Sequence, residues 1–185
     1  MALAGKIETE RLTIRAPRPG DGEVINTAIV ESFRELKPWM PWAQRLPSVE
    51  ESEGFVLEAQ QRFLARDDLA LLLFRKKDGY FIGASGLTRI DWSVPKFEIG
   101  YWCRSSLAGN GLISEAVAGI TEFAFEELAA QRVEIRVDDQ NQRSWRIPER
   151  LGFNLEGIAR CDALNASGEG LRNTRIYSMI SQDRK

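Results

Sequence analysis

Apolar residues recur along the chain with two periods, one of two residues and one of three to four, and segments of the two kinds are interspersed. Alternation or a short apolar run predicts strands in seven stretches. These are residues 11–16, 69–75, 80–91, 97–103, 132–137, 153–164 and 174–180. The apolar run at 69–75 is typical of a strand buried in the centre of a sheet. Gly83 and Gly86 indicate a bulge or a close backbone approach within the third stretch.

Spacings of three and four residues predict four helices between these strands. They cover about residues 22–31, 49–66, 112–130 and 142–151. Asp21 is a fair N-cap for the first helix, and Ser48 with Glu51 forms a capping box for the second. Asn141 is a plausible cap for the fourth, which contains Pro148 and ends at Gly152. The pattern predicts one mixed α/β domain over residues 1–185.

The segment between the first two predicted helices is both apolar and irregular. Residues 36–42 contain two tryptophans and a methionine, Trp39, Met40 and Trp42, together with two prolines, which disfavour regular structure there. Such a segment either packs as a loop against the core or lines a pocket. The sequence leaves both possibilities open.

A small-residue turn, residues 104–111, separates the strand at 97–103 from the third helix. A strand, a glycine turn and a helix start present several backbone N–H groups and the positive end of a helix dipole to an anion. Gly109 and Gly111 remove the Cβ atoms that would hold a phosphate away. The alternative is a turn that binds nothing.

Composition narrows the classes of protein that fit. The 185 residues suffice for one domain, and 43% hydrophobic with 28% charged residues is ordinary for a globular protein. A net charge of −2 argues against a nucleic-acid partner. No apolar run approaches the length of a membrane span, and the first residues lack a signal-peptide core. We therefore expect a cytoplasmic protein with no membrane partner.

The chain contains no histidine, which excludes an imidazole base and histidine-ligated metal. Cys103 and Cys161 are far apart in apolar segments, so we expect reduced core residues and no metal site. Any proton transfer must use a carboxylate, hydroxyl, thiol, phenol, amine or water.

Eight motifs, in order, resemble the GCN5-related N-acetyltransferase (GNAT) family, and in particular its RimJ/RimL branch, which acetylates N-terminal amines of ribosomal proteins. They are ERLTIR at 10–15, LKPWMPW at 36–42, FEIGYW at 97–102, SEA at 114–116, RVEIR at 132–136, NQRS at 141–144, IPERLGF at 147–153 and EG at 156–157. The resemblance covers nearly the whole chain, and the order and spacing make it specific.

The resemblance implies an α+β fold: a mostly antiparallel sheet of about seven strands, flanked by about four helices. The sheet is splayed open between its fourth and fifth strands, and acetyl-CoA lies in the cleft. It also implies transfer of the acetyl group to a primary amine, foremost the N-terminal α-amine of a ribosomal protein. Whether the enzyme is a monomer or a homodimer is left open.

In the family, the glycine turn binds the diphosphate of the cofactor. The sequence pattern of this turn is Arg or Gln, any two residues, Gly, any one residue, and then Gly or Ala. Here that pattern falls on Ala108, Gly111 and Ile113, and only the first glycine is retained. We expect Ala108 to lose a side-chain contact and Ile113 to narrow the approach. Binding then falls to backbone N–H groups of Leu107, Ala108, Gly109, Asn110, Gly111, Leu112 and Ile113.

The resemblance also assigns the pantetheine arm of acetyl-CoA. Backbone groups of Tyr101, Trp102 and Cys103 would pair with it as with an added strand. Asn141 would hydrogen-bond the arm from the other side, and Ser144 lies beside it.

The chemistry is attack of a neutral amine on a thioester. A peptide α-amine has a pKa of about 7.7–8.0, against about 10.4 for lysine, so a strong base is less necessary. Glu98 is the candidate base, directly or through water, or else a solvent-facing strand carboxylate. Relatives place a tyrosine acid where this chain has Pro148, which leaves Ser144 as donor to the leaving sulfur, or as a first-turn serine bonding the backbone. Cys103 is treated as core.

Trp39, Trp42 and Arg89 are candidates for the acceptor site, with core packing expected for at least one tryptophan. Two alternatives to a protein N-terminus remain. One is a small amine, such as an antibiotic, a polyamine or an amino acid, and the other is a non-catalytic acyl-CoA-binding module.

Overall fold

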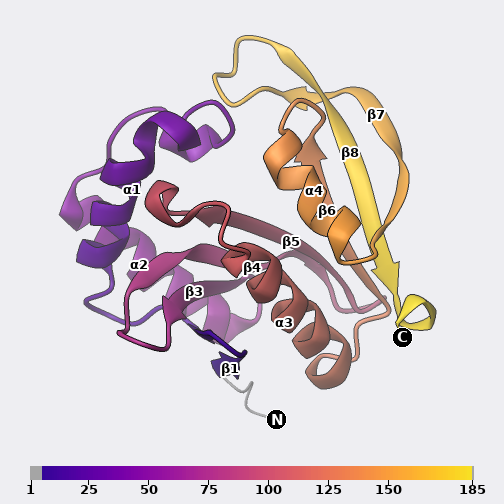
Figure 1. Cartoon of the computed structure of the whole chain (residues 1–185), viewed down its shortest axis with the longest axis horizontal. Coiled ribbons are helices and arrows are strands. Elements are labelled where there is room, and N and C mark those ends of the chain that lie inside the picture. The colour runs from indigo at the N-terminus through magenta and orange to yellow at the C-terminus, as the bar shows by residue number, and fades with distance from the viewer. Residues whose placement is uncertain (1–5, 185) are drawn as a thin grey trace.

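The computed structural model describes residues 6–184. The elements are β1 (Lys6–Glu8), β2 (Leu12–Arg15), α1 (Gly22–Leu36), α2 (Val49–Ala65), β3 (Leu69–Arg75), β4 (Phe81–Asp91), β5 (Lys96–Cys103), α3 (Leu112–Glu127), β6 (Arg132–Asp138), α4 (Gln142–Arg150), β7 (Asn154–Leu164) and β8 (Leu171–Ile180) (Figure 1). The first residues, for which the sequence predicts no signal peptide, lie outside this range. None of the described helices is long and apolar enough to cross a membrane.

The strands form a single sheet in the order β1-β2-β3-β4-β5-β6-β8-β7. Neighbouring strands are antiparallel except β5 and β6, which are parallel. These two pair only where residues 96–98 of β5 meet residues 132–134 of β6. Beyond that point β5 runs on to Cys103 and β6 to Asp138 without pairing, and the strands diverge (Figure 1). The sheet is thus split between the two strands where the resemblance places the split.

The described residues form eight strands, one more than the seven predicted. The extra strand, β1, precedes the first predicted stretch, residues 11–16. The backbone turns back here, because Thr9 N–H donates to the carbonyl oxygen of Leu12 at 3.0 Å. This turn lets β1 pair antiparallel with β2.

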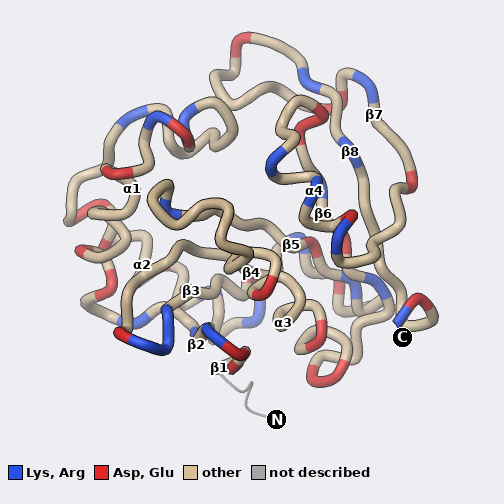
Figure 2. Tube along the Cα trace, viewed as in Figure 1, with Lys and Arg blue, Asp and Glu red and all other residues tan. Residues whose placement is uncertain are grey.

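Helices cover both faces of the sheet. On one face α1 and α2 pack against Leu72 and Phe81. On the other, α3 packs against a larger apolar core that includes Leu71, Phe97 and Ile99. Leu71 and Leu72 therefore serve opposite faces, which explains the unbroken apolar run of β3. Basic and acidic residues both occur over much of the chain, although α3 carries acidic residues only (Figure 2).

Two local predictions about α1 are wrong. The helix continues past residue 31 to Leu36, which is buried, and Pro38 follows closely enough to end it. Asp21 precedes the helix, but its side chain does not cap it. The carboxylate instead pairs with Arg15 at 2.7 Å and accepts the N–H of Arg18 at 2.7 Å. A competing cation from β2 thus takes the oxygen atoms that a cap would use.

The glycines of β4 serve close backbone approaches, as predicted. A Cβ on Gly83 would overlap the carbonyl oxygen of Trp102 on β5. One on Gly86 would lie 2.8 Å from the carbonyl oxygen of Leu69 on β3. The pairing of β3 with β4 also shifts register beside Gly83, which is the predicted bulge. Side chains at these positions would push β4 away from its neighbours.

We predict that Gly83→Ala lowers the free energy of unfolding by about 2–3 kcal/mol, because the added Cβ overlaps a backbone atom that has little room to move. Gly54→Ala is the matched control. Gly54 lies inside α2 with no atom near the Cβ position, so its replacement should stabilise the helix by about 0.5–1 kcal/mol. Denaturant unfolding measures both. Equal effects of the two substitutions would contradict the packing described for β4.

Candidate functional site

A cavity of about 600 Å³ lies at the split, on the face covered by α1 and α2. Strands β3 to β6, both of these helices and the N-terminus of α4 contribute to its wall. Six of the residues singled out from the sequence line it: Trp39, Trp42, Tyr101, Trp102, Asn141 and Ser144. Glu98, Arg89, Cys103 and the glycine turn are not among the lining residues, although Ile99 and Gly100 are. The structure thus brings together segments more than one hundred residues apart in the chain.

The aromatic loop lines the cavity rather than the core. Trp42 is 48% exposed, with its ring centroid 5.8 Å from that of Trp102, and Trp39 is half-buried. The expectation that at least one of the two loop tryptophans packs in the core is therefore wrong. The reason is that Trp102, on the face of β5 beneath α1 and α2, already fills the space below the loop and contacts Phe81.

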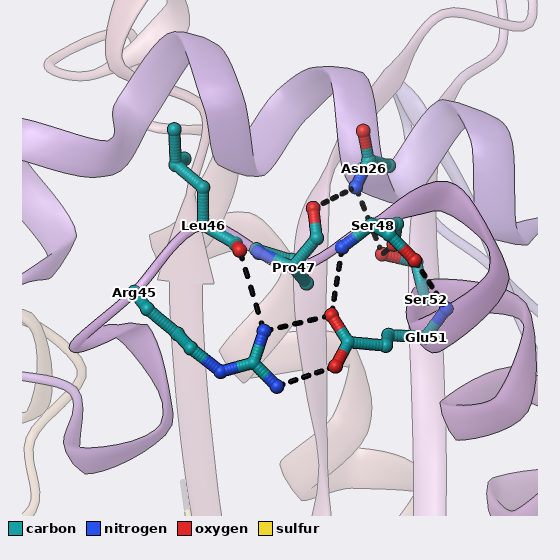
Figure 3. A network of polar contacts seen from close by, with 7 residues as sticks. All are labelled: Asn26, Arg45, Leu46, Pro47, Ser48, Glu51 and Ser52. Carbon is teal, nitrogen blue, oxygen red and sulfur yellow. Dashed lines mark hydrogen bonds and ion pairs between the residues drawn. The ribbon is translucent and has the colours of Figure 1, made fainter.

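Polar contacts fix residues 45–48, which follow the tryptophan-containing segment 36–42, to α1 and α2 (Figure 3). The predicted capping box is present: the N–H of Glu51 donates to Ser48 Oγ at 3.1 Å, and the N–H of Ser48 donates to the Glu51 carboxylate at 2.8 Å. The same carboxylate pairs with Arg45. Asn26 of α1 donates to the carbonyl oxygen of Pro47 at 2.8 Å. These contacts attach the end of the connection between α1 and α2 to both helices.

Tyr101 and Ser144 connect the two sides of the split. The phenol of Tyr101 on β5 donates to the backbone carbonyl oxygen of Ser144 on α4 at 3.0 Å. Burial raises the pKa of Tyr101 far above its usual range, so the phenol stays protonated and remains a donor. The sequence analysis considered only the backbone of Tyr101. The hydrogen bond between Tyr101 and Ser144 depends on how α4 packs against the sheet, so no local sequence pattern predicts it.

The start of α4 places two polar side chains at the cavity. Asn141 Oδ1 accepts the N–H of Ser144 at 3.3 Å, which confirms the predicted cap. The hydroxyl of Ser144 forms no hydrogen bond with any residue between 6 and 184, so the predicted alternative, a serine bonding the backbone, is not what the structure shows. Its hydroxyl is therefore available to a bound molecule.

Glu98 is a part-buried carboxylate beside the split. Its side chain is 16% exposed, which rules out the solvent-facing alternative. Arg89 Nε lies 3.4 Å from Oε2, an oxygen that makes no hydrogen bond within the described residues. Burial raises the pKa of Glu98, and the nearby arginines oppose that rise only in part. A carboxylate with a raised pKa and an unused acceptor site is suited to accept a proton.

Arg89 reaches Glu98 through an irregular backbone. The register of β4 against β5 shifts between Thr88 and Asp91, and Arg89 itself has a φ of +45°. Its side chain is 72% exposed and points to Glu98 rather than into the cavity. The structure therefore does not place Arg89 on the predicted acceptor wall. Arg89 instead contacts the candidate base, Glu98, from outside the cavity.

The glycine turn leaves a row of backbone donors free. No residue in the described part of the chain accepts a hydrogen bond from the N–H groups of residues 109–114. Gly109 and Gly111 have φ of +83° and +76°, a conformation in which a side chain is strained. α3 begins at Leu112, so its first-turn N–H groups and its dipole add to the row. This arrangement is suited to a phosphate.

Contacts on the α1 side hold the turn in place. Arg104 is buried and lies 3.0 Å from Glu31, and the N–H of Ser105 donates to Ser32 Oγ at 2.9 Å.

On the β2 side, Arg11 donates to the carbonyl oxygen of Asn110 at 3.1 Å and to Glu115 at 2.6 Å. Hydrogen bonds from Thr9 and Arg11 outweigh burial and lower the pKa of Glu115. The sequence analysis quoted Arg11 and Glu115 only within motifs. Their opposite charges were the only feature of the sequence that could have indicated this ion pair.

Two expectations about single side chains, Ile113 and Cys161, need correction, and two others, Cys103 and Ala108, agree with the structure. Ile113 is buried in the core, so it does not narrow the approach to the turn. Cys161 is exposed, not a core residue, because the edge strand β7 bulges there and Cys161 has a φ of +51°. Cys103 does pack against the core, and burial raises the pKa of its thiol to about 11. Ala108 is exposed and offers no side-chain donor.

Comparison with known proteins identifies similar sequences and folds. The family model described as acetyltransferase (GNAT) domain matches residues 11–154. The Bacillus subtilis (strain 168) protein named "Putative ribosomal N-acetyltransferase YdaF" is 34% identical over 178 residues, which are 94% of this chain and 93% of that protein.

Solved structures of acetyltransferases have a similar fold. A "Probable acetyltransferase" superposes with a TM-score of 0.88 at 27% identity, covering 97% of this chain and 98% of its own. The structure of RimL, the ribosomal L7/L12 alpha-N-protein acetyltransferase, in complex with coenzyme A also has a TM-score of 0.88, with coverage of 97% and 99%. Its identity of 19% supports likeness of fold alone.

Proposed function

The chain belongs to the GNAT acetyltransferase family, and from that premise we propose that it transfers the acetyl group of acetyl-CoA to the N-terminal α-amine of a ribosomal protein. The observation that carries this proposal is the split in the sheet. It lies between a turn of free backbone donors on one side and a cavity with an aromatic wall on the other. Two substrates can therefore meet at the split from opposite faces.

The groups around the split can bind acetyl-CoA. The free N–H groups of residues 109–114 would bind its diphosphate, and the unpaired edge of β5 at Tyr101, Trp102 and Cys103 would pair with its pantetheine arm. Asn141 offers its amide N–H₂, because its oxygen is occupied as the helix cap. The cofactor supplies an activated acetyl group as a thioester.

The acceptor amine would enter through the cavity beneath Trp39 and Trp42. An α-amine is partly neutral near pH 7.5, so the enzyme gains most by positioning it. Glu98, with its raised pKa, would take the proton that the amine loses on forming the amide bond, through a water molecule because it is not on the cavity wall. The free hydroxyl of Ser144 would donate to the departing sulfur.

A ribosomal protein as acceptor is supported by the name of the similar Bacillus subtilis protein, a putative ribosomal N-acetyltransferase. The cytoplasm is the matching compartment. Thiol release from acetyl-CoA, measured with a panel of ribosomal N-terminal peptides and small amines, tests the proposal. We expect turnover with at least one peptide and blocked turnover when its α-amine is already acetylated. Turnover with small amines alone would overturn the protein acceptor.

We predict that Gly111→Val weakens coenzyme A binding at least tenfold, because a β-branched residue is strained at this φ and displaces the free N–H groups. Gly168→Val is the matched control, with a φ of +79° and open space, in the turn between β7 and β8. Calorimetric titration of coenzyme A measures both. Unchanged affinity in Gly111→Val would show that the phosphates bind elsewhere.

Ser144→Ala should lower kcat about tenfold to a hundredfold and leave the affinity for acetyl-CoA nearly unchanged, since a donor to the leaving group acts only in the transition state. Steady-state kinetics with saturating peptide measures the first effect and titration the second. Turnover equal to wild type would remove Ser144 from the mechanism.

Glu98→Gln should change the pH dependence of kcat/KM. In the wild type, both the amine and Glu98 must lose a proton, so the slope of log kcat/KM against pH steepens from one to two below the pKa of Glu98. Burial raises that pKa, so the steep limb begins above the ordinary glutamate value of about 4.3. The variant should keep a slope of one and lose about a hundredfold in rate. Identical profiles would exclude Glu98 as the base.

A further inference from the structure

Every charged side chain in the wall of the cavity except one has an ion-pair or hydrogen-bond partner among the described residues. Glu51 pairs with Arg45; Arg62 lies 3.8 Å from Glu58 and 4.0 Å from Asp68; Arg136 lies 2.8 Å from Asp162; and Asp138 accepts the N–H of Gln140 at 2.9 Å. Arg172 also lines the cavity, and no ion pair or hydrogen bond joins its side chain to any residue between 6 and 184. Among the described residues, it is therefore the one charged group of the wall that has no direct partner.

Arg172 is held in place by its strand. It is the second residue of β8 and pairs with Ala163 of β7, so its Cα position is fixed by the hairpin. The residue is half-buried, and Nε has almost no accessible surface and no acceptor. A buried N–H of a cation without an acceptor is costly. Such a group persists where a ligand supplies the missing acceptor.

Two carboxylates interact electrostatically with Arg172, but neither forms an ion pair with it. Asp162 feels its charge but is already paired with Arg136. Glu98 feels it too, and is paired with Arg89. Both carboxylates therefore stabilise Arg172 from a distance and leave its donors free. The planar guanidinium matches a carboxylate with two parallel hydrogen bonds.

We propose that Arg172 binds a carboxylate of the acceptor, so that the preferred substrate is a peptide with an Asp or Glu side chain close behind its N-terminal amine. The inference deepens the proposed function and rests on it for the peptide. Ser144 and Arg172 line the same cavity, so the amine and the acid are bound together. The guanidinium also favours the neutral, reactive form of a nearby amine.

The test compares peptides that differ only by Asp or Asn at the second or third residue. Wild type should show a kcat/KM at least tenfold higher for the Asp peptide at one of these positions. Arg172→Gln should bring that ratio close to one, and Arg172→Lys should retain part of it. Arg160→Gln is the control, because Arg160 is exposed on β7 outside the cavity wall and its loss removes the same charge. Equal coenzyme A affinity in all variants shows that they are folded.

A second arm separates this inference from the proposed function. Free amino acids and their amides replace the peptides. Turnover of amino acids alone, with a preference over the amides that Arg172→Gln removes, supports carboxylate binding and overturns the peptide acceptor. If no acceptor is acetylated, calorimetric titration of the Asp and Asn peptides into the coenzyme A complex decides. Equal rates or affinities for acid and amide in wild type would overturn the role of Arg172.

Discussion

The short contact between β5 and β6 is the constraint on which the site depends. Three residue pairs join these strands at one end, and the rest of each strand is free of the other. Because parallel neighbours that stayed paired would form a continuous sheet, the early divergence alone creates an unpaired strand edge in the middle of the protein. A hydrogen bond from Tyr101 on β5 to the carbonyl oxygen of Ser144 connects β5 to α4 across this opening.

The glycine turn shows how a flexible sequence is made into a rigid binding element. Glycines make its conformation possible, but they do not fix it. Fixing comes from outside, through Arg104 and Glu31 on the α1 side and through Arg11 and Glu115 on the β2 side. The anchors use side chains and carbonyl oxygens, so the N–H row is left free. A site organised before binding loses less entropy when a ligand arrives.

The structure leaves some stabilisation unrealised near the split. Glu98 Oε2 and Arg172 Nε lack acceptors or donors within the described residues, and Arg89 adopts a strained φ. Each would be easier to replace than to keep if stability alone mattered. Arg89 lies on β4 beside Glu98. Glu98 on β5 and Arg172 on β8 lie near the split, which fits the proposal that a substrate supplies their missing hydrogen-bond partners.

Local chemistry determined what the sequence revealed by itself. The capping box at Ser48, the cap at Asn141 and the close approaches at Gly83 depend on neighbours or on backbone form, and all were predictable. The family followed from motifs. Tertiary structure alone decided the exposure of Trp42, the pairing of β1 with β2, the position of Arg172 in the cavity wall, and the contacts of Arg11 and Tyr101. Those contacts join residues tens to more than a hundred positions apart. Periodicity shows which face of an element is apolar, but which partner meets it depends on how the elements pack.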